Sequence, residues 1–128
     1  MKSLIHHIGL QVNEEDIKNF YVDVLKCNII REFKINKDLS DSIFKIKNEV
    51  KVVCMKLGNI DFELFIDNEK KDKSFNHICL FSENIEEIIK RAKERNYKVF
   101  TKINPNKNNT HFISDSNNNI FEIKKLED

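Results

Sequence analysis

The sequence repeats itself, and this repetition limits the possible folds more than any other feature. Residues 7–10 (HIGL) match residues 77–80 (HICL), and residues 54–64 match residues 113–123 without a gap. Units of this size usually pair because neither can bury its apolar face alone. The repeat therefore predicts two similar units that share one core.

Each unit predicts the same order of elements. Apolar and polar residues alternate in the opening segments, as in half-buried strands, and apolar residues then recur with helical spacing after Asn13 and Asn84. Gly58-Asn59 predicts a hairpin between two of the later strands. The predicted strands cover residues 5–12, 28–35, 41–47, 50–57, 59–66, 75–82, 97–103, 109–115 and 119–126.

This order predicts an α+β fold made of two βαβββ repeats. We expect one domain over residues 1–128, with repeats 1–66 and 75–128 joined by a charged linker, residues 67–74. The two repeats are expected to pair into an open, barrel-like mixed sheet with the helices on its convex face. Ile8, Leu10, Val12, Ile78 and Leu80 are predicted to face those helices.

The composition narrows the class of partner. The 22 basic residues nearly balance the 21 acidic residues and are mixed with them, which argues against nucleic acid as a partner. No apolar run approaches the length that a membrane span needs. The three cysteines form no close pair, and the polar start does not resemble a signal peptide, so we expect a reduced protein in the cytoplasm.

Four metal-ligating side chains occupy equivalent places in the two repeats. His7 and His77 lie in the opening strands, and Glu63 and Glu122 lie in the closing strands, all with the parity that faces the concave side. Two imidazoles and two carboxylates suit Ni, Zn or Co, with Fe or Mn as further candidates. A single strand histidine is more often a packed or exposed residue, so the repetition itself carries this prediction.

The order of these segments resembles the vicinal oxygen chelate superfamily, which includes glyoxalase I, fosfomycin-resistance enzymes, extradiol dioxygenases and bleomycin-binding proteins. HHIGLQV, NFYVDVL, IDFELF and DSNNNIFEI are similar to successive motifs of that family, and the resemblance extends over nearly the whole chain. It is strongest to small glyoxalase I-type members. By this resemblance, the family's metal positions fall on His7, Glu63, His77 and Glu122.

Two positions depart from the family pattern. Lys26 stands where the family usually ends a helix with Gly, and Ser116-Asn117-Asn118 replaces Pro-Asp-Gly. Because Asn tolerates a left-handed backbone better than Lys, we expect the turn to survive and the helix end to be strained or rearranged.

The resemblance implies a metal-dependent lyase or isomerase of the glyoxalase I kind. Its substrate would be a small oxygen-chelating molecule, such as a thiol-aldehyde adduct, that reacts through an enediolate. Glu122 is the expected catalytic base, and Glu63 could share that role. The alternatives are a metal-free drug- or metabolite-binding protein of the bleomycin-resistance type, an acyl-CoA epimerase and a thiol transferase. A homodimer is expected from the family.

Further side chains are candidates for lining the cavity. Recognition of glutathione normally needs cationic side chains at the mouth of the cavity. Arg91 and Arg95 lie on the predicted second helix, away from the concave face, which weakens the prediction of a strictly glutathione-dependent enzyme. Cys79 shares the parity of His77, and His6 is expected to point to the other face. The candidate lining residues are Gly9, Gln11, Asp61, Phe65, Cys79, Phe81 and His111.

Overall fold

The first repeat forms a four-stranded mixed sheet. The computed structural model describes residues 1–127. The first sheet has the order β1-β4-β3-β2, with β1 at His7–Val12, β2 at Asn28–Ile35, β3 at Val50–Leu57 and β4 at Ile60–Ile66. β1 runs parallel to β4, and the other neighbours are antiparallel. The predicted hairpin between β3 and β4 is thereby confirmed.

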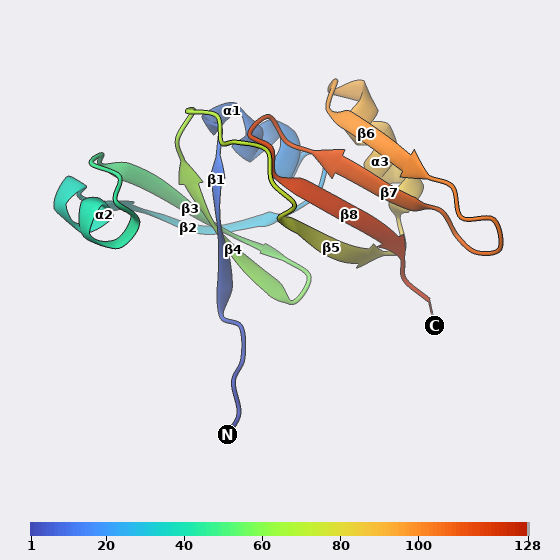
Figure 1. The fold of residues 1–128 in the computed structure, drawn as a ribbon, viewed down its shortest axis with the longest axis horizontal. Coiled ribbons are helices and arrows are strands. Elements are labelled where there is room, and N and C mark those ends of the chain that lie inside the picture. Colours follow the sequence, from blue (N-terminus) through green and yellow to red (C-terminus); the bar gives the residue numbers. More distant parts are fainter. Residues whose placement is uncertain (128) are drawn as a thin grey trace.

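The second repeat builds the same sheet again. Its order is β5-β8-β7-β6, with β5 at His77–Ser82, β6 at Lys98–Lys102, β7 at Thr110–Ser114 and β8 at Ile120–Lys125. Figure 1 shows the two sheets side by side. The α+β class is confirmed, but the described strands form two separate sheets rather than one continuous sheet, and they close no barrel.

The helix after β1 is wound differently from an ordinary α-helix. A short α1, Glu14–Asp16, leads into a π-helix, η1, over Ile17–Val22. The backbone N–H of Leu25 then donates to the carbonyl of Phe20 at 3.0 Å. This helical segment ends at Lys26, which adopts a left-handed φ of 61° that a glycine would accept more easily. The expected strain at this position is therefore present.

A second helix, α2 over Lys37–Phe44, occupies a segment for which the sequence predicted a strand at 41–47. The side chain of Asn36 caps it by accepting the N–H of Leu39 at 2.8 Å, and Lys45 ends it with a φ of 61°. The strand prediction was wrong because this local cap outweighed the β-branched residues that follow. Across residues 1–127, no helix is long and apolar enough to cross a membrane.

One hydrophobic core joins the two repeats. Phe20 of η1 lies 5.7 Å from Phe121 of β8, and Phe62 of β4 lies 6.2 Å from the same ring, measured between ring centroids. The predicted helix-facing strand residues pack in or against this core, as expected: Ile8, Leu10, Val12, Ile78 and Leu80. The helices that follow β1 and β5 thus fill the convex side and leave the concave faces of both sheets largely uncovered.

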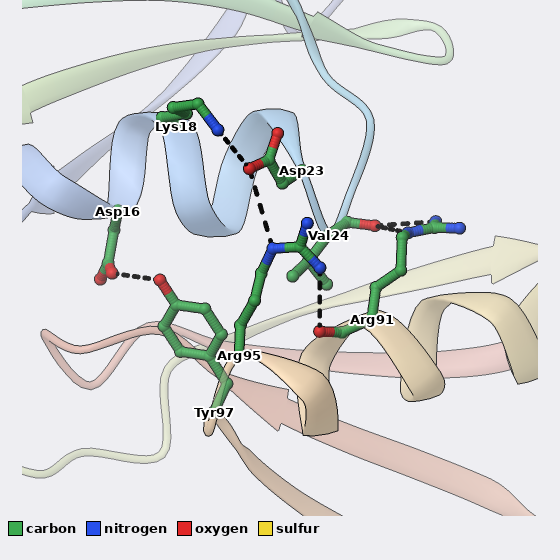
Figure 2. Close-up of polar contacts among 7 residues, drawn as sticks. All are labelled: Asp16, Lys18, Asp23, Val24, Arg91, Arg95 and Tyr97. Atoms are coloured by element: carbon green, nitrogen blue, oxygen red, sulfur yellow. Dashed lines mark hydrogen bonds and ion pairs between the residues drawn. The ribbon is translucent and has the colours of Figure 1, made fainter.

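The helical segments of the two repeats are also tied by polar contacts (Figure 2). Arg91 of α3, which spans Ile85–Glu94, donates to the carbonyl of Val24 at 3.1 and 2.9 Å through two guanidinium nitrogens. Arg95 forms an ion pair with Asp23 at 3.7 Å. Both arginines are therefore engaged on the helix side, as the sequence predicted.

Asp16 forms a second polar link between the repeats. This carboxylate is buried and accepts the hydroxyl of Tyr97 at 2.6 Å, a contact that Figure 2 also shows. It accepts the backbone N–H of Ser116 as well, at 2.6 Å. Because burial is costly for a carboxylate without donors, these contacts explain how Asp16 can lie between the repeats.

The turn before β8 is organised by the buried carboxylate of Asp115. It accepts the backbone N–H groups of Asn117 and Asn119 at 2.9 Å each, and the hydroxyl of Tyr21 at 2.7 Å. Burial raises the pKa of Asp115, and the bonds it accepts oppose that rise. Asn118 adopts a φ of 60°, so the turn survives with asparagine in place of glycine, as predicted.

Candidate functional site

The first repeat places a histidine and a glutamate together on its concave face. In the parallel register of β1 and β4, Gly9 lies opposite Glu63, so His7 and Glu63 share one side of the sheet. His7 Nε2 lies 3.3 Å from Glu63 Oε1. The ring of Phe65 lies over Gly9, where a larger side chain would meet it.

The second repeat reproduces this pair. Cys79 of β5 lies opposite Glu122 of β8, and His77 Nε2 lies 3.2 Å from Glu122 Oε1. Glu122 Oε2 also lies 3.5 Å from the Nζ of Lys124. The two glutamate side chains are similarly shielded, at 17% exposure for Glu63 and 16% for Glu122. The repeats therefore carry two nearly identical histidine–glutamate pairs.

The other ring nitrogen of each histidine also has a partner. His77 Nδ1 lies 2.9 Å from the backbone carbonyl of Phe75, which can only accept a hydrogen bond, so Nδ1 is the donor of this contact. His7 Nδ1 lies 2.8 Å from His6 Nδ1. His6 therefore contacts His7, and the prediction that it points to the opposite face was wrong. In both repeats Nε2 is the nitrogen that faces the glutamate.

The four predicted ligands form two separate pairs within one chain. Among residues 1–127, no group of three or more histidine, cysteine, aspartate or glutamate side chains is close enough to hold a metal ion. Each pair offers one nitrogen and one oxygen, whereas Zn²⁺ in proteins usually takes at least three protein ligands. One pair alone is therefore half of a metal site.

A pocket of about 510 Å³ adjoins the first pair, between α2 and the concave face of the first sheet. Three predicted cavity residues line it, namely Gly9, Gln11 and Phe65. Ser40 and Phe44 of α2 complete the wall. These two residues were not predicted, because part of this segment was expected to form a strand. Asn36 ahead of a Leu39–Ile43 spacing is nevertheless compatible with a capped helix.

The second sheet carries an equivalent but chemically different pocket. Its volume is about 390 Å³, and its lining includes Phe81, Lys107, Lys124 and Lys125. Phe81 is 67% exposed, and Phe100 on the same sheet is 65% exposed. Both rings therefore leave a large apolar surface open in the single chain.

The remaining predicted lining residues lie in different places. Asp61 is held in an ion pair with Lys56 at 3.0 Å. Cys79 is exposed, and both partial burial and the Glu122 carboxylate raise the pKa of its thiol, which disfavours the nucleophilic thiolate. His111 pairs with Ile123 in the register of β7 and β8, so it lies on the helix side of the sheet, away from Glu122.

Solved structures with the same architecture come from bacterial resistance and glyoxalase-family proteins. The fosfomycin resistance protein FosX from Listeria monocytogenes matches with a TM-score of 0.74 and 16% identity over 99% of this chain and 96% of that one. FosX from Mesorhizobium loti gives 0.68 and 16% over 96% and 91%. A glyoxalase family protein from Enterococcus faecalis gives 0.68 and 21% over 94% and 96%.

A mutant of the Listeria protein was crystallised with Mn(II) and 1S,2S-dihydroxypropylphosphonic acid. No curated protein sequence matches this chain. A family model does match it: the model of the Glyoxalase/Bleomycin resistance protein/Dioxygenase superfamily covers residues 6–113, which is most of the chain and includes His7, Glu63 and His77. The chain therefore belongs to the glyoxalase/bleomycin resistance protein/dioxygenase superfamily.

Proposed function

We propose that this protein is a metal-dependent enzyme whose active site is completed by a second copy of the chain. The His7–Glu63 pair of one copy would face the His77–Glu122 pair of the other, and the site would act on a small molecule with neighbouring oxygen atoms. The observation that carries this proposal is the duplicated pair, with Nε2–Oε1 distances of 3.3 and 3.2 Å on two open sheet faces.

The donor set fits a divalent cation. Two neutral imidazoles and two carboxylates balance its charge, and two carboxylates turned toward one another would repel without it. Nitrogen and oxygen donors suit Ni, Zn, Co, Fe and Mn. The Listeria protein was crystallised with Mn(II), which supports manganese as one of the candidate metals. The Nδ1 contacts of His7 and His77 favour Nε2 as the ligating atom in both cases.

The exposed apolar side chains support a homodimer. Phe81 and Phe100 stand on the concave face of the second sheet and are 67% and 65% exposed. Apolar surface gathered on one face is typical of an interaction site. A two-fold dimer would place the first sheet of each copy against the second sheet of the other and so form two equivalent sites.

The glutamates supply proton transfer at this site. A bound divalent cation acts as a Lewis acid that stabilises negative charge developing on substrate oxygen. Glu122 is the proposed base because of the family resemblance, and its contact with Lys124 holds the carboxylate at the edge of the lysine-lined pocket. Glu63 occupies the equivalent position and can return the proton. This chemistry is that of a glyoxalase-like isomerase or lyase.

A second candidate is an enzyme that acts on a phosphonate or another small anion, as a thiol transferase or a hydrolase would. The observation that favours it is the cluster of Lys107, Lys124 and Lys125 around the second pocket, since ammonium groups bind phosphonate and phosphate oxygens. The fold similarity to fosfomycin resistance proteins points the same way.

The state of the cysteine thiols is an indication of the cellular compartment. Cys27, Cys54 and Cys79 are free thiols, and burial raises the pKa of Cys27 to about 12. Free, unreactive thiols are typical of proteins in a reducing compartment. We therefore propose a cytoplasmic location.

Metal content is the first test. Protein purified without a chelator or a polyhistidine tag is expected to hold, or to rebind at micromolar concentration, one equivalent of Mn, Zn, Ni, Co or Fe per chain. Glu122→Gln should lose this metal, and the control Glu32→Gln should keep it, because Glu32 lies on β2 in an ion pair with Lys51. A wild-type protein that binds none of these metals would instead support the metal-free binding protein.

A substrate panel separates the two enzyme candidates. Metal-loaded protein should be assayed with methylglyoxal hemithioacetals of several thiols, a racemic acyl-CoA, and fosfomycin with and without thiol. Turnover of a hemithioacetal that is lost in Glu122→Gln supports the isomerase or lyase. Turnover of fosfomycin that is lost in Lys124→Gln, with hemithioacetals inert, supports the second candidate.

A further inference from the structure

The pocket beside α2 is positioned to receive part of the same molecule that the His7–Glu63 pair would bind. Gly9 lies opposite Glu63, and Gln11 lies opposite Phe65 in the β1–β4 register. Alternate residues on one strand face are about 7 Å apart. The pocket therefore begins one side-chain interval beyond the histidine–glutamate pair, on the same concave surface.

Gly9 makes room for the ring of Phe65, which lines the pocket. A Cβ added at Gly9 would lie 3.3 Å from Cε1 of Phe65, which is closer than ordinary van der Waals contact. The Phe65 ring in turn packs edge-on against Phe44 of α2, with ring centroids 5.1 Å apart. A larger residue at this position would have to displace the Phe65 ring, so Gly9 helps to set the shape of the pocket.

The lining of this pocket is apolar and carries only negative charge. Its charged members are Glu49 and Asp67, and no lysine, arginine or histidine is among its lining residues in the described part of the chain. The apolar members are Leu10, Phe44, Ile46, Val50, Phe65 and Ile66. Glu49 is 62% exposed and forms an ion pair with Lys34 at 3.7 Å, so the negative charge of the lining rests mainly on Asp67. An anionic group entering here would lose part of its water shell beside Asp67, whereas an apolar group would gain from leaving water.

The equivalent pocket of the second repeat shows that this polarity is not a general property of the fold. When the gapless match of residues 54–64 with residues 113–123 is extended in both directions, Phe65 corresponds to Lys124 and Glu49 corresponds to Asn108. Both of those second-repeat residues line the lysine-rich pocket. The two repeats have therefore diverged from a shared backbone position into one anionic, apolar pocket and one cationic pocket.

We infer that the substrate carries an uncharged, apolar arm that enters the α2 pocket while its oxygen atoms bind at the His7–Glu63 pair. The inference rests on the proposed function for the position of the oxygen-binding end. It assigns Phe44, Val50 and Phe65 as specificity-determining contacts. Asp67 and the apolar lining disfavour substrates in which that arm is an anion.

Hydroxamates test this inference, since they bind metals through two neighbouring oxygen atoms. Isothermal titration of metal-loaded protein should compare acetohydroxamate, octanohydroxamate and suberic acid monohydroxamate, whose tail ends in a carboxylate. Octanohydroxamate is expected to bind at least roughly tenfold more tightly than acetohydroxamate, because its tail is buried. Suberic acid monohydroxamate should gain less than about twofold, because its carboxylate would have to lose its water shell in the pocket.

Two sets of variants locate the tail. Val50→Phe fills the pocket and should remove the advantage of octanohydroxamate while leaving acetohydroxamate within about twofold of wild type. Ser40→Leu is a second filling variant, for use if Val50→Phe lowers the melting temperature. Glu49→Gln combined with Asp67→Asn should let the carboxylate-tailed probe bind several times more tightly. The Asp67→Asn change keeps a side-chain oxygen as acceptor for the N–H of Glu69, which Asp67 accepts at 2.9 Å.

The outcomes separate this inference from the proposed function. If acetohydroxamate binds but octanohydroxamate gains nothing, or if its gain survives both filling variants, the inference is overturned while the metal site stands. If no metal and no hydroxamate bind, the proposed function fails. The pocket is then tested in metal-free protein by saturation-transfer NMR with octanamide and octanoate, and the inference survives only if octanamide alone binds and Val50→Phe abolishes it.

Discussion

The two repeats hold equivalent histidine–glutamate pairs by different means. His77 is oriented by the backbone carbonyl of Phe75, which can only accept a hydrogen bond and so fixes the proton on Nδ1. His7 is oriented by the ring of His6, which can either donate or accept. The second pair is therefore set by the main chain, whereas the first depends on a side chain that a mutation can remove.

The largest expected effect concerns the pairs themselves. His7→Ala and His77→Ala should each weaken metal binding strongly. The loss should exceed the roughly 10- to 100-fold that is typical of removing a residue that hydrogen-bonds to a metal ligand. The two losses should be similar, because both histidines belong to the same set of four metal ligands. Competition titration with a metallochromic indicator measures this. His111→Ala, on the helix side of its sheet, is the matched control and should keep the metal.

The turns that precede the closing strands should differ strongly in their contribution to stability. Asp115→Ala leaves the buried donors of Tyr21, Asn117 and Asn119 without their acceptor and should lower the free energy of unfolding by about 3 kcal/mol. Gly58→Ala in the exposed hairpin of the first repeat strains a φ of 59° and should cost only about 1 kcal/mol. Urea denaturation compares them, and equal losses would contradict the assigned role of Asp115.

The dependence of His7 on His6 predicts a smaller effect. His6→Ala removes the partner of His7 Nδ1 and should weaken metal binding by about tenfold, at the lower end of what such partners contribute. Asn76 occupies the equivalent place before β5, and Asn76→Ala should leave the affinity within about twofold, since the Phe75 carbonyl still orients His77. If the two variants behave alike, the contrast between the repeats does not hold.

The smallest expected effect compares the helix ends. Lys26 and Asn96 occupy equivalent positions with φ values of 61° and 62°. Lys26→Gly should raise the free energy of unfolding by about 1 kcal/mol because a side chain in this conformation is strained. Asn96→Gly should change it by only a few tenths, about 0.3 kcal/mol, because Asn already tolerates this backbone. Urea unfolding measures both changes, and equal gains in the two variants would contradict the strain at Lys26.

Much of the fold follows from the sequence because its strands alternate clearly. β2 at Asn28–Ile35 and β3 at Val50–Leu57 have the predicted bounds. β4 begins one residue later than predicted, and β8 is one residue shorter at each end. α2 was missed because its cap at Asn36 is a local contact in a segment rich in β-branched and aromatic residues. The π-helical winding of η1 was not predicted, because the apolar spacing after Asn13 fits an ordinary α-helix equally well.

The candidate site was predictable only in part. Strand parity was sufficient to place His7 with Glu63 and His77 with Glu122, since residues of one parity share a face. Parity says nothing about how two sheets are placed, so it could not show that the pairs lie apart within one chain. The contact of His6 with His7 was also missed, because His6 precedes the strand and does not follow its alternation.

The shared metal site is tested most directly by complementation between two inactive variants. One chain carries His7→Ala and Glu63→Gln, and the other carries His77→Ala and Glu122→Gln. Neither alone should bind metal, but in a two-fold dimer a mixed pair contains one site with all four ligands intact. Equal co-expression should therefore restore about one metal ion per four chains. Mixed dimers that form but stay metal-free, or either variant binding metal alone, would contradict a site shared between two copies.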